Sequence, residues 1–271
     1  MSKNRMRSWA GALTTSLTLI AMGAIGCAPA EEEGDSEARL ETYADLQQEH
    51  EALNQLRQEH AELSAKIAAG VDGIEVPEGS EQTAEEILAE LEAREEALAN
   101  EITTSADALM GRIVTFINED PWVEGEEKTE TQTGAVRMKS AEDLVLAMEF
   151  VEKGGDYKRA TDIISRALEI DPDNQELLDK LAWVEEMRYM SEDRFAAVEV
   201  GMTEEEVRAA LGPPNLANVR DYEGGRVGWY YPRGSNPNAD GAAGVFFQPE
   251  RGVLTVYEAD FDAIEPAATE G

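Results

Sequence analysis

The stretch VGMTEEEVRAALGPP (residues 200–214) decides how the C-terminal part of the chain folds. Thr203 is placed to cap a short helix, and Glu206, three residues later, completes a capping box. Met202 precedes the cap and is placed to pack on the helix as a hydrophobic staple. Gly212 suits the left-handed position after a helix, and the prolines that follow cannot extend it. The sequence therefore predicts a helix of about two turns with both ends defined.

Segments rich in aromatic and β-branched residues follow this helix and predict three strands, at residues 227–231, 245–247 and 253–257. Val207 and Leu211 lie on one face of the helix, so we expect that face to pack on the sheet. The C-terminal part is therefore predicted to be a small α+β domain with an antiparallel sheet.

Side chains along each strand alternate between the two faces of the sheet. We expect the core face to hold Trp229, Tyr231, Phe247 and Val253. We expect the opposite face to hold Tyr230, Phe246 and Tyr257. If that second face is open, its aromatic residues form a candidate partner surface; the alternative is that residues 194–200 cover it.

Residues 192–258 resemble the BamE (SmpA/OmlA) family of outer-membrane assembly lipoproteins. The resemblance rests on Gly201, Met202, Thr203, Val207, Leu211, Gly212, Pro214, Trp229 and Tyr231. It implies a helix-plus-sheet domain with an accessory role in outer-membrane β-barrel assembly, and it implies that these motif residues are structural. The same architecture occurs in β-lactamase inhibitor proteins, so the fold alone leaves open an inhibitor or binder of a periplasmic enzyme.

The N-terminus is typical of an exported lipoprotein. Residues 1–26 combine a basic start with an apolar run shorter than a membrane span, and they end at Ala24-Ile25-Gly26-Cys27, which resembles a lipobox. Cys27 is the only cysteine, so it has no disulfide partner in the chain, and acylation explains it; the alternative is an ordinary secretory cleavage site. We therefore expect a lipid anchor in the outer membrane, facing the periplasm, followed by a flexible acidic tether at residues 27–36.

The composition is strongly acidic, with a formal net charge of −34. Such a surface repels the phosphate backbone of nucleic acids, so nucleic acid is excluded as an expected partner. Aromatic residues make up only 6% of the chain and charged residues 30%, which favours long, solvated helices over one large core. A multi-domain, mostly α protein is the predicted class.

Residues 37–118 predict a helical coiled-coil hairpin. Leu46, Leu53, His60 and Ile67 recur every seven residues, and a break at residues 70–79 separates them from a second helix that Thr83 caps. The alternative is a coiled coil between two copies of the chain, which would make the protein a homo-oligomer. His50 and His60 are the only histidines, and neither has the cysteine or further imidazole neighbours of a metal site.

The remaining segments divide into linker, module and tail. Residues 119–138 predict a linker. Residues 139–190 resemble a tetratricopeptide repeat with a following helix, and so predict a three-helix TPR-like module that begins at a cap on Ser140. Residues 259–271 are expected to be a disordered tail.

The sequence contains no arrangement typical of an active site. Both histidines lie on the predicted coiled coil, away from any candidate nucleophile, and no glycine-rich phosphate loop is present. We therefore expect no enzyme activity, no cofactor and no metal. The predicted function is a lipid-anchored protein-binding or scaffold factor of the cell envelope; the alternatives are the periplasmic enzyme binder and a mechanical spacer.

Overall fold

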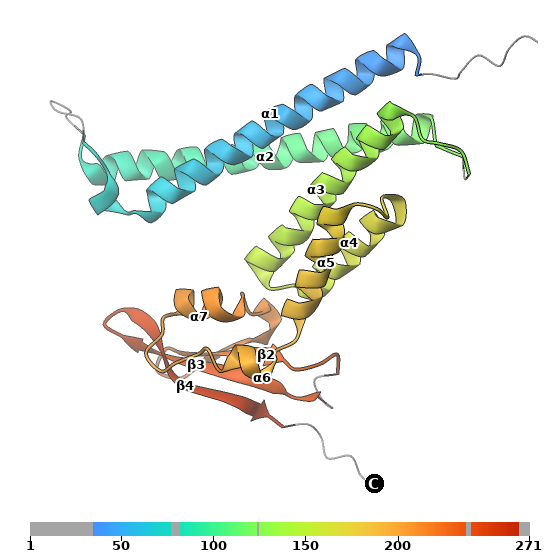
Figure 1. Ribbon diagram of the computed structural model, residues 1–271. Helices are drawn as coiled ribbons and strands as arrows, with labels where there is room; N and C mark the ends of the chain where they lie inside the picture. The colour runs from blue at the N-terminus through green and yellow to red at the C-terminus, as the bar shows by residue number, and fades with distance from the viewer. Residues whose placement is uncertain (1–34, 77–81, 124, 237–239, 266–271) are drawn as a thin grey trace, which may run out of the picture. The chain divides into compact units, whose positions relative to one another are not determined.

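The computed structural model describes residues 35–76, 82–123, 125–236 and 240–265 (Figure 1). The predictions for the signal peptide, for Cys27 and for most of the acidic tether lie outside these residues, and so does the prediction for residues 266–271.

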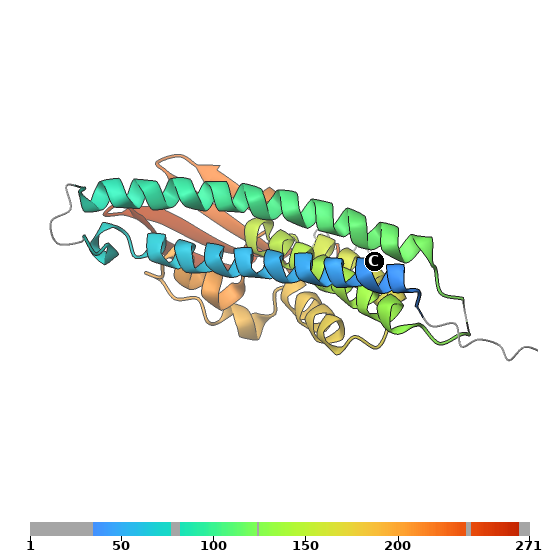
Figure 2. The same ribbon diagram turned by 90° about the horizontal axis from the view of Figure 1, so that it is seen from above.

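The first two long helices form an antiparallel hairpin. Helix α1 (Glu37–Ala68) and helix α2 (Ala84–Glu119) lie side by side, joined through the short helix η1 (Val71–Gly73) (Figures 1 and 2). Two ion pairs join the helices, Glu49 with Arg112 and Glu59 with Arg94. The second pair lies later in α1 but earlier in α2, as antiparallel helices require. The hairpin within one chain is therefore confirmed. No helix in the described ranges is both long enough and apolar enough to cross a membrane.

The hairpin seam is buried at only some of the predicted positions. Leu46 and Leu53 are buried, whereas His60, expected at the next seam position, is half-buried with its Nε2 3.9 Å from Glu95. The main buried cluster of the hairpin instead includes two residues from the next helix. The core consists of Leu46, Leu53, Leu109, Ile113, Phe116, Ala135 and Met138. The buried leucines are seven residues apart in α1 (Leu46, Leu53) and eleven apart in α2 (Leu98, Leu109), so the two helices have different apolar periods. The third helix thus covers part of the surface that the hairpin leaves open.

That third helix begins earlier than predicted. Helix α3 spans Glu130–Gly154 and is capped by Thr129, whose hydroxyl oxygen accepts from the Gln132 amide at 3.2 Å. The prediction that residues 119–138 form a linker is therefore wrong from residue 130 onward, because a Thr-x-x-Gln capping box supplies the start signal. Ser140, predicted to be the cap, lies inside the helix and is fully buried.

One buried ion pair joins α3 to α1. The side chain of Glu142 is only 4% exposed and accepts two hydrogen bonds from Arg57, of 2.8 and 2.7 Å. His50 Nε2 lies 3.3 Å from the same carboxylate. Because two parallel hydrogen bonds fix both planes, the pair sets how α3 lies against the hairpin.

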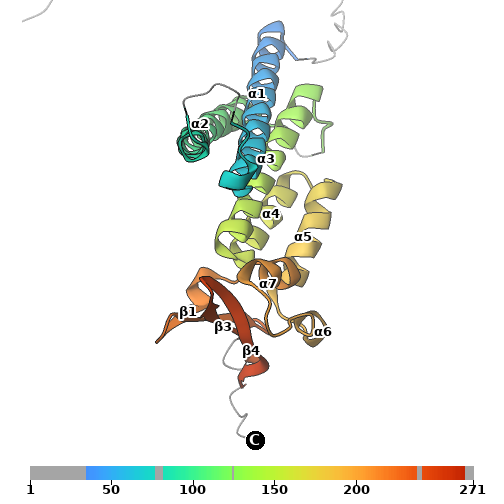
Figure 3. The same cartoon turned by 90° about the vertical axis from the view of Figure 1, so that its left-hand side faces the viewer.

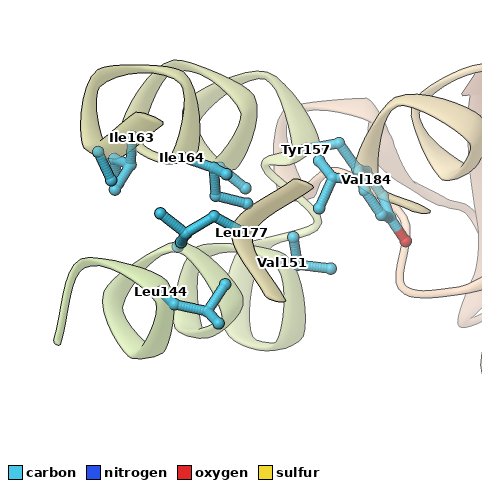
Figure 4. Close-up of a cluster of buried hydrophobic side chains, with 10 residues drawn as sticks. Leu144, Val151, Tyr157, Ile163, Ile164, Leu177 and Val184 are labelled. Atoms are coloured by element: carbon cyan, nitrogen blue, oxygen red, sulfur yellow. The ribbon is translucent and has the colours of Figure 1, made fainter. Parts of the chain in front are cut away.

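Helices α3, α4 (Tyr157–Ile170) and α5 (Gln175–Arg188) pack in sequence around one apolar cluster (Figure 4). Helix α4 is capped by Asp156, and α5 is capped by Asn174. The cluster consists of Leu144, Ala147, Val151, Tyr157, Ala160, Ile163, Ile164, Ala167, Leu177 and Val184. A single helix pair does not bury such a set alone, so α5 acts as the cover.

The C-terminal part contains a four-stranded antiparallel sheet. Helices α6 (Glu192–Phe195) and α7 (Glu204–Leu211) and the short η2 (Leu216–Asn218) precede the strands. The strands are β1 (Val219–Tyr222), β2 (Arg226–Pro232), β3 (Ala242–Glu250) and β4 (Val253–Ile264), in the spatial order β1-β2-β3-β4.

The sheet differs from the sequence-based expectation in two places. The sequence does not predict β1, because its four residues carry only one aromatic side chain. The disordered tail predicted from residue 259 is wrong up to Ile264, since β4 continues there and Ile264 pairs with Ala242. The acidic residues of this segment weaken the strand pattern in the sequence. Phe261 nevertheless packs against the buried apolar cluster of the sheet.

We predict that the Glu142 pair contributes strongly to stability. Glu142→Gln should lower the free energy of unfolding by about 2 kcal/mol, because it removes the charged partner of the half-buried Arg57 guanidinium. Urea denaturation of the purified chain measures the change.

The matched control is Glu149→Gln, which breaks an exposed pair with Lys153 and should cost less than about 1 kcal/mol. The double variant Arg57→Met with Glu142→Leu should recover most of the loss, since it removes both charges together. Equal losses of unfolding free energy in Glu142→Gln and Glu149→Gln would contradict the prediction.

Candidate partner-binding surface

The predicted capping box at the start of α7 is confirmed. The Thr203 amide donates to the Glu206 carboxylate at 2.8 Å, and the Glu206 amide donates to the Thr203 hydroxyl at 3.3 Å. The hydrogen bond from the Thr203 backbone lowers the pKa of Glu206 below its usual value. The position and start of α7 are therefore set by its own first turn.

The three residues Gly201, Met202 and Thr203 also pair with the sheet. The Gly201 amide donates to the Val256 carbonyl, and the Val256 amide donates to the Met202 carbonyl, both at 2.8 Å. Thr203 forms a bridge with Thr255. The motif thus shields part of the free edge of β4, which sequence reasoning missed because the pairing joins residues more than fifty positions apart.

Helix α7 packs on one face of the sheet, which we call the inner face (Figure 3). Val207 and Leu211 are fully buried there together with Trp229 and Phe247, whose ring centroids lie 4.6 Å apart. Burying these four side chains contributes to the apolar stabilisation of the sheet and its helix.

The remaining motif residues close the end of α7. Tyr231 is buried, and its hydroxyl donates to the Gly212 carbonyl at 3.1 Å. Burial raises the pKa of Tyr231, so the hydroxyl keeps its proton and remains a donor. Gly212 has φ +82° and ψ 167°, which is a glycine-only conformation but not the predicted left-handed helical one, and Pro214 is buried beyond it.

The prediction that Val253 belongs to the sheet core is wrong. Val253 is 52% exposed, and Val256, which pairs with Phe247, is buried in its place. Val253 and Tyr257 are separated by an even number of residues, so a regular strand puts both on the same face. A core position for Val253 is therefore incompatible with an outer position for Tyr257.

The predicted aromatic face is assembled on the other side of the sheet. The rings of Tyr230 and Phe246 meet edge to face at 5.8 Å, and Phe246 contacts Tyr257 at 6.3 Å. Tyr222 of the unpredicted β1 adds a fourth ring, and its hydroxyl lies 2.5 Å from that of Tyr230. We call these four residues the outer aromatic face; each is half-buried or exposed.

Two glycines form the floor of the outer aromatic face. A Cβ at Gly228 would lie 3.2 Å from Phe246 Cδ1, and one at Gly244 would lie 2.9 Å from Phe246 Cζ. Phe246 therefore lies over bare backbone. Glycine at these positions of neighbouring strands is the sequence signal for a ring that crosses the sheet.

The segment 194–200 does not cover this face. Phe195 and Val198 pack in the inner cluster, where the Phe195 ring lies 5.7 Å from Phe261. Among the described residues, the buried apolar side chains of both α6 and α7 therefore pack on the inner face. A hollow of about 250 Å³ also opens beside Tyr222 and Tyr230, between Arg220 and Ile264.

The chain matches no protein-family model, no curated protein and no solved structure.

The outer aromatic face combines aromatic rings with hydrogen-bond donors. Burial, followed by the hydrogen bond with Tyr222, raises the pKa of Tyr230 to about 12, so its hydroxyl stays protonated at neutral pH. Aromatic rings with hydroxyl groups supply large contact areas and hydrogen bonds in protein interfaces. Within the described ranges, no three His, Cys, Asp or Glu side chains gather as metal ligands would.

We predict that the two motif glycines differ in importance. Gly212→Ala should lower the free energy of unfolding by about 3 kcal/mol, because the added Cβ would meet the Tyr157 hydroxyl at 2.3 Å in a conformation that alanine avoids. Gly201→Ala, where the site is open, should cost only about 1 kcal/mol for its positive φ. Thermal or urea unfolding separates the two, and a larger effect at Gly201 would contradict this difference in packing.

Proposed function

We propose that the protein is a lipid-anchored, non-catalytic factor of the cell envelope that binds another protein through its outer aromatic face. The observation that carries the proposal is that Tyr222, Tyr230, Phe246 and Tyr257 adjoin on a sheet face whose opposite side receives α6 and α7.

The size and chemistry of this face support a protein partner. Aromatic side chains supply large apolar contact areas at the centres of interfaces, and the exposed parts of these four adjoining rings form one continuous surface. Clusters of this kind hold most of the binding energy in protein complexes. The resemblance of residues 192–258 to the BamE (SmpA/OmlA) family suggests the class of partner, a component of outer-membrane β-barrel assembly.

The helical segments support a scaffold role for the rest of the chain. Helices α1 and α2 have 32 and 36 residues, which makes each about 50 Å long. Helices α3 to α5 form the proposed TPR-like module. In the chain, these helices separate the proposed anchor at Cys27 from the sheet, so we propose that they act as a spacer.

The placement of the histidines supports the absence of catalysis. His50 pairs with Glu142, and His60 lies beside Glu95. Ser64 comes close to that second pair, but its hydroxyl donates to Glu95 and not to His60. A nucleophilic serine needs the imidazole as its direct base, so this order does not activate it.

The proposal predicts a specific cross-link. Photo-reactive phenylalanine analogues at Tyr230 or Phe246, introduced into the full chain in cells, should capture an outer-membrane assembly component. The same analogue at Trp183, an exposed aromatic residue of α5, is the matched control and should capture none. A Cys27→Ala version should leave the membrane fraction and lose the cross-link, because it lacks the thiol that is acylated.

Two results would change the proposal. Capture of a soluble periplasmic enzyme at Tyr230 and Phe246 would favour the inhibitor-like function of the same fold. Products confined to lipid and solvent at both positions would contradict protein binding by this face.

A further inference from the structure

A groove of about 690 Å³ lies between the helical hairpin and the helices that follow it. Helix α2 supplies one wall and helix α3 supplies the other, while α1 and α5 each contribute two residues to the lining. We call this space the α2–α3 groove. None of its lining residues belongs to the C-terminal sheet, so a partner bound here would be independent of the proposed function.

The α2–α3 groove contains an apolar strip that the chain itself covers only in part. Ile102 of α2 and Val145 and Met148 of α3 line the groove, and all three are half-buried. Ile102 and Met148 also pack against the buried clusters of the hairpin and the module, whereas Val145 belongs to none of the three apolar clusters. Apolar side chains on two facing helices therefore remain open to a further element.

The charged residues of the α2–α3 groove carry a surplus of negative charge. Five glutamates line it, against the cations Arg57, Lys153 and Lys180. Two of these cations already have partners, because Arg57 binds Glu142 outside the lining and Lys153 lies 3.3 Å from Glu149. The chain thus supplies too few cations to neutralise the carboxylates of its own groove.

Three of the five glutamates form no ion pair among the described residues, namely Glu96, Glu152 and Glu176. Glu176 lies in the first turn of α5, where the helix dipole stabilises a negative charge. Glu152 lies in the last turn of α3, where the dipole opposes one, and Glu96 lies in the interior of α2. The positions of Glu96 and Glu152 therefore give their charges no stabilisation from the fold.

Exposed carboxylates are common in this chain, which has 57 acidic residues, so charge alone does not mark a site. In the α2–α3 groove, however, the exposed Glu96 and Glu152 accompany the apolar strip. From this combination we infer that the groove binds a basic amphipathic helix of a partner protein. The apolar face of that helix packs on Val145 and Met148, and its lysine or arginine side chains pair with the two glutamates.

Other classes of partner fit the α2–α3 groove less well. Nucleic acid and anionic lipid are repelled by its carboxylates. A purely polar cation would leave the apolar strip in water, and a neutral apolar peptide would cover the carboxylates without pairing them. A basic helix satisfies both parts of the lining, and the negative potential of the groove would also accelerate its association.

The test is a titration of the purified chain with a synthetic peptide of about 18 residues, made of leucine, alanine and lysine with the leucines on one helical face. We expect saturable binding, with the largest amide chemical-shift changes at Ala99, Ile102, Val145 and Met148. A second peptide has the same composition but leucines spread around the helix. It should bind about tenfold more weakly, because it cannot cover the apolar strip.

Two variants address the two parts of the lining. Glu96→Gln combined with Glu152→Gln should weaken binding about tenfold, since each exposed ion pair contributes about threefold. Val145→Ser should weaken it about fivefold through the loss of apolar contact. Both variants should remain folded, because neither Val145 nor the two glutamates are fully buried, and urea denaturation checks this.

The matched control is Glu101→Gln combined with Glu169→Gln, which removes the same charge at exposed positions of α2 and α4 outside the groove. It should change the affinity by less than about twofold, because distant exposed charges are screened by salt. Three results would each overturn the inference: equal binding of the two peptides, equal losses in the two double variants, or shift changes on the outer aromatic face in place of the groove.

Discussion

A β-sheet has two faces, and the packing of α7 on one of them is the constraint on which the C-terminal domain depends. Val207 and Leu211 bury Trp229 and Phe247, while the Thr203 capping box and Gly212 leave the helix only about two turns to do so. A helix packed on the inner face leaves the other face uncovered. The aromatic residues that alternate outward then meet each other and the solvent, and the glycines beneath Phe246 let them lie close together.

The helical part is held together differently. Two helices whose apolar residues repeat with different periods cannot pack evenly, and α3 fills the gap with Ala135 and Met138. The buried Glu142–Arg57 pair then orients α3 on the hairpin. At the other end of the same module, the buried hydroxyl of Tyr157 lies against Gly212 and makes no hydrogen bond within the described residues. Buried polar groups therefore mark both ends of the three-helix module.

Much of this fold could be predicted from local signals. The capping boxes at Thr83 and Thr203, the hairpin, and the side of the sheet on which Trp229, Tyr231 and Phe247 lie all follow from short-range pattern and periodicity. Two failures had local signals, namely the capping box at Thr129 that starts α3 and the strand alternation that places Val253 on the outer face. The other failures share a physical cause, namely contacts between distant residues. Strand β1 and the end of β4 form by pairing with neighbours, and Glu142 is buried by a partner on α1. In the outer aromatic face, Tyr230, Phe246 and Tyr257 were predictable from alternation, whereas Tyr222 joins them only through β1.

The central claim is that the outer aromatic face is free in the isolated chain and covered by a partner in the cell. Hydroxyl-radical footprinting of Tyr222 and Tyr257, in the purified chain and in intact cells, tests it most directly. Tyr189, which is half-buried outside this face, serves as the internal reference. We predict that both outer tyrosines are modified readily in the purified chain and several-fold less in cells, relative to Tyr189. Equal modification in the two settings would contradict the claim.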